Sequence, residues 1–129
     1  MYENTQNPYI IEIGKFEDTR GILISADLNH CLFEIKRVFV ITSSNNQLSR
    51  GNHAHKTCRQ LILSVGGNLF VSFRNTIGAD ELVVREGFGL MVPAWNWCSV
   101  RFENTNTSAV VLCSEIYNPE DYIEEIPSD

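Results

Sequence analysis

The chain has 129 residues, of which 43% are hydrophobic and 20% are charged, and its formal net charge is -6. This length suits one domain with a core of its own, so we expect residues 1–129 to form a single domain. The composition excludes a disordered chain and a membrane span, and the acidic balance argues against a nucleic-acid partner.

The N-terminal segment, residues 1–8, is polar and lacks the basic and apolar parts of a secretory signal. The four cysteines are widely spaced and form no CxxC motif; they are Cys31, Cys58, Cys98 and Cys113. Without a signal for secretion, we expect free thiols in a reducing cytoplasm. A free cysteine is usually a small buried apolar residue, and each of these is expected to be one.

Short runs rich in β-branched and aromatic residues follow one another, separated by polar or glycine-containing turns. The runs span residues 9–13, 22–25, 32–42, 60–65, 69–74, 82–85, 90–92, 97–102 and 109–116. In the fifth run strict alternation places Leu69, Val71 and Phe73 on one face. This number and spacing of short strands predict an all-β sandwich or barrel.

Helical periodicity is nearly absent from the chain. The exception is Asn118-Pro119-Glu120-Asp121, which offers a capping side chain, a proline at the first turn and acids near the positive end of the helix dipole. This segment predicts one short C-terminal helix before the tail.

Two histidines, His53 and His55, lie two residues apart in a strand context, which directs both side chains to the same face. Two adjacent imidazoles are poor core material because buried polar rings need partners. An exposed pair at the start of a strand is the alternative. We favour a functional pair, because histidine carries out proton chemistry near neutral pH.

The spacing around this pair resembles the two motifs of the cupin family, in which an HxH element, a later acid and a further histidine line a small β-barrel. Gln60 stands where metal-binding cupins carry glutamate, and Cys98 stands where they carry histidine. An amide is a weak ligand for a divalent cation, so we favour a barrel without a metal. Zinc held by His53, His55 and Cys98 remains the alternative.

A closer resemblance is carried by the segment Arg50-Gly51-Asn52-His53-Ala54-His55-Lys56. With Arg37-Val38-Phe39 before it, the segment looks like the motif of the dTDP-sugar 3,4-ketoisomerases, the WxcM-like branch of the RmlC-type cupins. Further similar pieces lie at 20–23, 93–97 and 117–123, so the resemblance extends from about residue 11 to residue 126.

The resemblance implies a cupin jelly-roll barrel and an isomerase that converts dTDP-4-keto-6-deoxyglucose to a dTDP-3-keto-6-deoxyhexose. It also implies an enzyme without metal or other cofactor, and a homodimer with an exchanged N-terminal strand. The products of the family supply amino sugars for surface glycans, such as the O-antigen of lipopolysaccharide.

For this reaction a base must remove the proton at C3, giving an enediolate that is reprotonated at C4. We assign His55 as the carbon base and His53 as the proton shuttle or oxyanion donor. The sequence leaves the reverse assignment open. The diphosphate requires cations, and Arg20, Arg37 and Arg50 are the candidates.

Among these arginines, Arg37 is the strongest candidate because its strand neighbours are apolar and an inward cation there needs an anion. For Arg20 the alternative to a phosphate contact is a solvated position in a turn. For Arg50 the alternative is an ion pair with an acid at the rim of the barrel.

Gln60, Trp97 and Cys98 complete the predicted substrate contacts. Relatives in the family often carry tyrosine near Phe39 and histidine or arginine at Cys98, so the configuration at C4 of the product stays open. Two other functions also stay open: a dTDP-sugar 3,5-epimerase, and a metal-binding or non-catalytic cupin.

Overall fold

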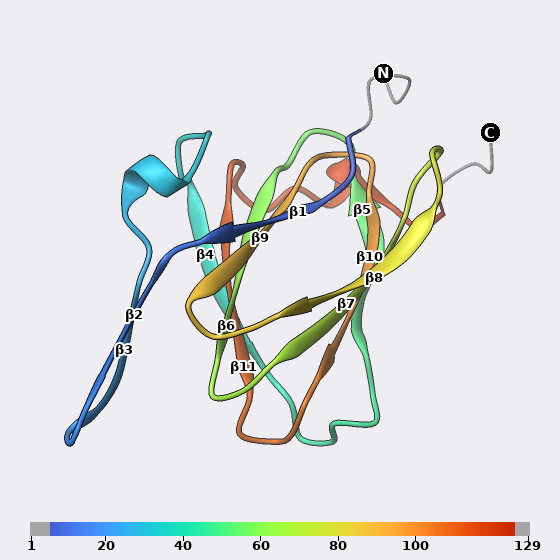
Figure 1. The fold of residues 1–129 in the computed structure, drawn as a ribbon. Helices are drawn as coiled ribbons and strands as arrows, with labels where there is room; N and C mark the ends of the chain where they lie inside the picture. The colour runs from blue at the N-terminus through green and yellow to red at the C-terminus, as the bar shows by residue number, and fades with distance from the viewer. Residues whose placement is uncertain (1–5, 126–129) are drawn as a thin grey trace.

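The computed structural model describes residues 6–125, which form two facing five-stranded sheets and a separate hairpin (Figure 1). The first sheet has the strand order β1-β9-β6-β11-β4, and the second has the order β12-β5-β10-β7-β8. All the pairings are antiparallel. The all-β, jelly-roll prediction is therefore confirmed.

The strands of the first sheet are β1 (Tyr9–Glu12), β9 (Phe88–Val92), β6 (Gln60–Val65), β11 (Ser108–Cys113) and β4 (Arg37–Thr42). Those of the second are β12 (Tyr122–Ile123), β5 (Arg50–His55), β10 (Trp97–Phe102), β7 (Leu69–Arg74) and β8 (Ala79–Val84). The hairpin consists of β2 (Gly14–Asp18) and β3 (Gly21–Ser25). The predicted bounds of β6, β7 and β10 agree with those observed, and β2 was not predicted.

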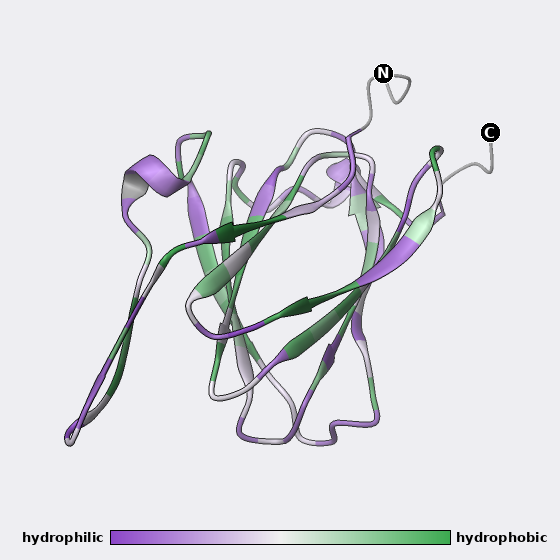
Figure 2. Cartoon of the chain, viewed as in Figure 1, coloured by the Kyte–Doolittle hydropathy of each residue, from purple (hydrophilic) through white to green (hydrophobic). Residues whose placement is uncertain are grey.

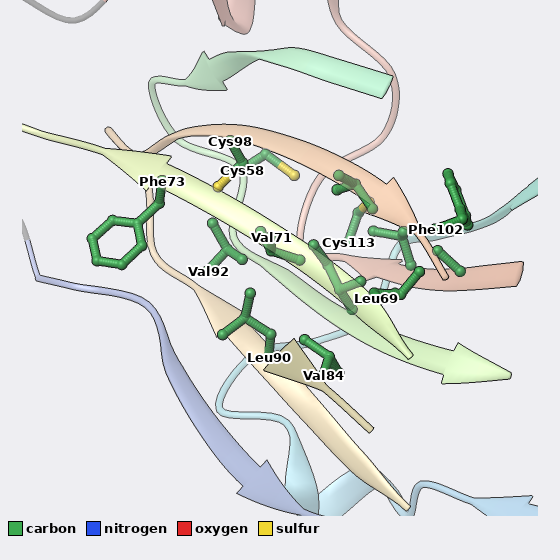
Figure 3. Close-up of a cluster of buried hydrophobic side chains, with 14 residues drawn as sticks. Cys58, Leu69, Val71, Phe73, Val84, Leu90, Val92, Cys98, Phe102 and Cys113 are labelled. Atoms are coloured by element: carbon green, nitrogen blue, oxygen red, sulfur yellow. The ribbon is translucent and has the colours of Figure 1, made fainter. Parts of the chain in front are cut away.

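The main core lies between the inner faces of the two sheets (Figure 3). As the alternation predicted, Leu69, Val71 and Phe73 of β7 are all buried in it. Strand β6 is buried on both faces: Ile62 packs into the main core, and Leu61 packs into a second cluster on the outer side. These close-packed layers hold the strands that carry the functional side chains.

The helical segments of the described residues are two single 3-10 turns, η2 (Leu28–His30) and η3 (Pro119–Asp121). The predicted start at Asn118 is confirmed, because its side chain accepts a hydrogen bond from the Glu120 amide at 3.1 Å. The segment makes only one turn, since Tyr122 becomes extended and pairs with β5. Nowhere in residues 6–125 is there a helix of the length and apolar character that crossing a membrane requires.

The hairpin β2–β3 stands away from the two sheets (Figure 1). Phe16 and Leu23 are opposite each other in its register, and 65% and 58% of their surfaces are exposed. Figure 2 shows that hydrophobic residues continue from the sheets into this hairpin. An isolated two-stranded hairpin is marginally stable, so these side chains lack the cover that such an element normally requires.

Candidate active site

A cavity of about 480 Å³ opens between the two sheets. Strands β4, β6, β9 and β11 line one side, and β5, β10 and β12 line the other. Most of the site residues predicted from the sequence line it, namely Arg37, Arg50, His53, His55, Gln60 and Cys98. The fold thus brings together, in one concave site, cations, histidines and a polar amide.

A β-bulge in β5 explains why Arg50 lines the same cavity as His53. Cys98 of β10 pairs with His53, but the next residue, Ser99, pairs with Gly51, so Asn52 is left without a partner. Asn52 has a φ of 60°, a left-handed value that asparagine adopts more readily than most residues. Three residues apart on a regular strand, Arg50 and His53 would face opposite sides, and the extra residue brings them to the same side.

His55 forms a buried pair with Asp121, which lies 66 positions further along the chain. Its Nδ1 atom is 3.0 Å from Oδ2 of Asp121, so an Nδ1–H donates to the carboxylate. The carboxylate also accepts hydrogen bonds from the Thr57 amide at 2.8 Å, the Thr57 hydroxyl at 2.7 Å and the Cys58 amide at 3.2 Å. The pair is therefore held in one orientation.

The Nε2 atom of His55 is buried and has no hydrogen-bond partner among the described residues. Because Nδ1 keeps its proton and donates it in the hydrogen bond to Asp121, Nε2 carries the lone pair in the neutral ring. Burial lowers the pKa of His55, while the hydrogen bond to Asp121 opposes that shift. The structure thus holds a neutral imidazole with an unpartnered basic nitrogen in a residue that lines the cavity.

The pKa of Asp121 also moves below its ordinary value. Burial alone would raise it, but the hydrogen bonds from Thr57, Cys58 and His55 outweigh burial. The carboxylate consequently remains ionised beside His55.

His53 and Tyr122 lie beside His55 and complete an aromatic cluster. The His53 ring centroid is 5.0 Å from that of His55 and 4.4 Å from that of Tyr122. Nδ1 of His53 is 2.8 Å from the Gly51 carbonyl oxygen, so Nδ1–H donates and Nε2 is the acceptor in the neutral ring. Both histidines of the sequence motif therefore line the same cavity, as predicted.

Arg37 and Arg50 supply positive charge to the cavity. The Arg37 guanidinium carbon lies 4.6 Å from the ring centroid of Phe39 and 5.3 Å from that of Tyr117. Within the described residues neither arginine forms a salt bridge. The two cations are therefore available to an anionic ligand, and Arg37 is held by aromatic faces rather than by an acid.

Two predicted contacts are not brought to the cavity. Arg20 lies at the tip of the hairpin, where its Nη2 donates to Asp18 at 2.6 Å. Trp97 faces the outer side of β10, and its Nε1–H donates to the Glu124 carbonyl at 3.0 Å. Since Cys98 faces inward, alternation along β10 directs its neighbour outward.

The positions of the side chains do not favour zinc at His53, His55 and Cys98. In residues 6–125 these three do not form a group whose potential ligand atoms all lie within 4.8 Å of one another. Within residues 6–125, a different group brings potential ligand atoms within 4.8 Å of one another, namely His55, Cys58 and Asp121. The carboxylate there is occupied by the hydrogen bonds described above, so we interpret this group as a hydrogen-bonded pair and not as a metal site.

The sequence predictions missed Asp121, Tyr122 and Asn96 as residues of the site. Asn96 lines the cavity, and its buried amide is hydrogen-bonded to Asn75 and the Pro93 carbonyl. Asp121 was noted as an acid near the positive end of the helix dipole and as part of the similar piece at 117–123, but no spacing relates it to a histidine 66 positions away. The pairing of β12 with β5 sets Tyr122 opposite His55, and this long-range pairing is the signal that would have revealed Asp121 and Tyr122.

A family model described as "FdtA: WxcM-like, C-terminal" matches residues 6–128 of the chain. The chain is also 29% identical, over 118 residues, to a TDP-4-oxo-6-deoxy-alpha-D-glucose-3,4-oxoisomerase from Aneurinibacillus thermoaerophilus. That match covers 90% of this chain and 85% of the relative.

Two solved structures resemble the fold closely. QdtA, a sugar 3,4-ketoisomerase from Thermoanaerobacterium thermosaccharolyticum solved in complex with TDP, gives a TM-score of 0.83 at 25% identity, covering 92% of this chain and 88% of that chain. WlaRB, a TDP-quinovose 3,4-ketoisomerase from Campylobacter jejuni, gives a TM-score of 0.81 at 26% identity, covering 94% and 95%. The predicted cupin fold is confirmed by these likenesses.

Proposed function

The chain belongs to the FdtA, WxcM-like family, and we propose that its substrate is dTDP-4-keto-6-deoxyglucose, which it converts to a dTDP-3-keto-6-deoxyhexose. Its relatives make it a sugar-nucleotide ketoisomerase, an isomerase that interconverts keto and hydroxyl groups within one molecule. The observation that carries the mechanism is the buried, unpartnered Nε2 atom of His55, oriented by Asp121 at the cavity.

In this mechanism Nε2 of His55 removes the proton at C3, which the neighbouring C4 ketone makes acidic. The C3–H electron pair forms the C3–C4 double bond, and the negative charge moves to the oxygen at C4. The imidazolium that forms is stabilised by the Asp121 carboxylate, which is ionised. The base is neutral before the step because burial lowers its pKa.

Reprotonation at C4 completes the reaction, while the proton of the C3 hydroxyl passes to the oxygen at C4. We assign this second transfer to His53, and its ring, 5.0 Å from that of His55, supports the assignment. Its Nδ1 is engaged with the Gly51 carbonyl, so Nε2 is the atom that accepts and returns a proton. Tyr122, against both rings, fixes their separation.

The diphosphate of the substrate is bound by Arg37 and Arg50. A guanidinium matches two phosphate oxygens in a bidentate arrangement, and these two have no carboxylate competitor among the described residues. Gln60 and Cys98 line the remaining wall against the sugar.

The test is to incubate the purified protein with dTDP-4-keto-6-deoxyglucose in deuterated water and follow the sugar by NMR. We expect migration of the carbonyl to C3, with deuterium incorporated at C4. His55→Asn should reduce turnover by at least about 10²-fold, the usual contribution of a general base. His30→Asn is the matched control, because His30 lies in η2 and does not line the cavity.

Two results would contradict this proposal. Absence of both migration and exchange with the folded wild-type protein would remove the isomerase mechanism. Exchange at C5 in addition to C3 would favour a 3,5-epimerase instead.

We further propose that the protein is a homodimer in which the hairpin β2–β3 packs against a second copy. The hairpin exposes Phe16 and Leu23, and the outer face of edge strand β4 exposes Val38 and Val40. A second copy would cover these apolar side chains and supply the packing that a lone hairpin lacks. Arg20, at the hairpin tip, would then belong to the other subunit's surroundings.

Mixed dimers test whether Arg20 acts across the interface. Arg20→Ala and His55→Asn proteins are each assayed alone, and then after being unfolded and refolded together. If Arg20 serves the site of the other subunit, mixed dimers contain one intact site and regain activity. No regain, in a mixture that light scattering shows to be dimeric, would contradict a role of Arg20 in the site of the other subunit.

A further inference from the structure

Negative charge on the oxygen at C4 requires a hydrogen-bond donor in the cavity, and this requirement rests on the proposed function. The charge develops when the C3 proton is removed, and a donor that is already in place stabilises the transition state. His53 does not supply this donor in its neutral form. Its Nδ1–H is engaged with the Gly51 carbonyl oxygen, and its Nε2 carries a lone pair.

Tyr122 lies beside both histidines on the same wall of the cavity. It is directly opposite His55 in the register of β12 and β5, and side chains in such a pair lie on the same face of the sheet. Its ring centroid is 4.5 Å from that of His55 and 4.4 Å from that of His53. The residue is half-buried and lines the cavity. Tyr122 is therefore next to the two groups to which we assign the proton transfers.

The hydroxyl of Tyr122 is available to a ligand. Among the described residues it has no hydrogen-bond partner. It is also not one of the fully buried polar atoms that lack a partner, so the oxygen is not sealed inside the protein. A phenolic hydroxyl in this position can donate to an oxygen of the bound sugar.

The amide and guanidinium side chains that line the cavity have other partners or positions. Asn96 donates its amide hydrogens to the Gln6 carbonyl at 2.9 Å and the Pro93 carbonyl at 3.0 Å. Gln60 projects from β6 in the facing sheet, across the cavity from the wall that carries the base. The two arginines bind the diphosphate in the proposed function. Tyr122 is thus the donor on the same wall as His55.

We propose that Tyr122 is a further catalytic residue, whose hydroxyl donates a hydrogen bond to the oxygen at C4 of the nucleotide sugar. The bond strengthens as the ketone oxygen becomes the charged oxygen of the enediolate. The hydroxyl keeps its proton, so the transfers assigned to His55 and His53 are unchanged and no covalent bond to the enzyme forms. Packing against the two histidine rings holds the donor in place before the reaction.

Tyr122→Phe tests this role, because it removes one oxygen and keeps the ring against both histidines. We expect kcat for carbonyl migration to fall by about 10²-fold, the usual cost of losing one such donor, with KM changed by less than about threefold. Deuterium incorporation at C4 should fall by the same factor, since both follow from the same enediolate. Tyr9→Phe is the matched control, because Tyr9 lies in β1 and does not line the cavity.

A folded Tyr122→Phe protein with the kcat of the wild type would overturn the inference. A rise in KM alone would overturn it as well, because the hydroxyl would then bind substrate and transition state equally.

Nitration of the wild-type protein by tetranitromethane, mapped by mass spectrometry, is a second test that requires no variant. The probe is dTDP-glucose, which has no ketone at C4 and so cannot react by this mechanism. At a saturating concentration we expect it to suppress nitration of Tyr122 and to leave that of Tyr9 unchanged. Equal nitration of Tyr122 with and without the probe would contradict a contact with the sugar. A wild-type protein that leaves dTDP-4-keto-6-deoxyglucose unchanged, although dTDP-glucose protects Tyr122, would instead contradict the proposed function and support the contact.

Discussion

Two opposing influences act on the pKa of the His55 side chain. Burial lowers its pKa and favours the neutral ring, whereas the hydrogen bond to Asp121 favours the charged ring. The first provides a free base before proton abstraction, and the second stabilises the imidazolium that forms during it. The Asp121 carboxylate, which stabilises the imidazolium, is held by hydrogen bonds from Thr57 and Cys58. The basicity of His55 therefore depends on these residues as well.

Asp121→Asn tests this arrangement. The Asn oxygen should remain toward Thr57, which presents two donors, so the NH2 group would face Nδ1 of His55. The ring would then carry its proton on Nε2, so that this atom has no lone pair with which to remove the substrate proton. We therefore expect kcat to fall by roughly 10²-fold or more. The pKa of His55, followed by NMR, should fall further because the influence that raised it is removed.

The control for that variant is Asp80→Asn, which changes an exposed acid on β8. Its kinetics and the titration of His55 should match the wild type. A His55 pKa that rises in Asp121→Asn would contradict the assigned hydrogen bond.

Arg37→Lys tests the phosphate contact. Lysine keeps the charge but loses the planar, bidentate group that stacks on Phe39 and Tyr117. We expect KM for the nucleotide sugar to rise roughly tenfold, with a smaller change in kcat, because the phosphates are remote from the reacting carbons. Arg101→Lys is the matched control, since Arg101 stacks on Phe70 outside the cavity. An unchanged KM would remove Arg37 from the phosphate site.

Strand β5 shows why part of the site could be predicted from the sequence and part could not. The two histidines of HAH share a face by simple alternation, and this was correctly predicted. Arg50 shares that face only because of the bulge at Asn52, which depends on pairing with β10 and not on the local pattern. Trp97 is the opposite case, because alternation already forbids it from facing inward beside Cys98.

Gly51→Ala tests the bulge. Gly51 has a φ of 96°, and an added Cβ would lie 3.0 Å from the Cys98 carbonyl oxygen, which is backbone and has little room to move. We expect the free energy of unfolding to fall by roughly 1–3 kcal/mol, measured by urea denaturation. Turnover should fall as well, because the Gly51 carbonyl holds the His53 ring.

Gly78→Ala is the control for this variant, since a Cβ at Gly78 meets nothing within 4 Å. Its unfolding free energy should stay within about 0.5 kcal/mol of the wild type, or increase slightly. Equal effects of the two substitutions on the unfolding free energy would show that the bulge does not require glycine at position 51.

The net charge of -6 describes the whole molecule and not its cavity, where the described residues place two unpaired arginines. Composition predicted a chain that forms a core, and the short apolar runs correctly predicted a β-rich fold, but neither predicted the position of the hairpin β2–β3. The hairpin's sequence alternates like that of any strand pair, and only the folded chain shows that the described residues leave Phe16 and Leu23 largely exposed.

Acid stability is the last whole-molecule property that the site determines. His55 has a lowered pKa in the folded state, so the unfolded chain gains a proton first as the pH falls below its ordinary value of 6.5. The contribution of the neutral ring to the free energy of unfolding is therefore fully present above pH 6.5. It is lost as the pH falls through the pKa of His55 in the folded state. We expect the unfolding free energy to fall as the pH falls through this window, measured by urea denaturation. His55→Asn should abolish this part of the pH dependence, and His30→Asn should retain it. A change in unfolding free energy between pH 7 and pH 5 that is the same in the wild type and in His55→Asn would contradict the buried, neutral state of His55 on which the mechanism depends.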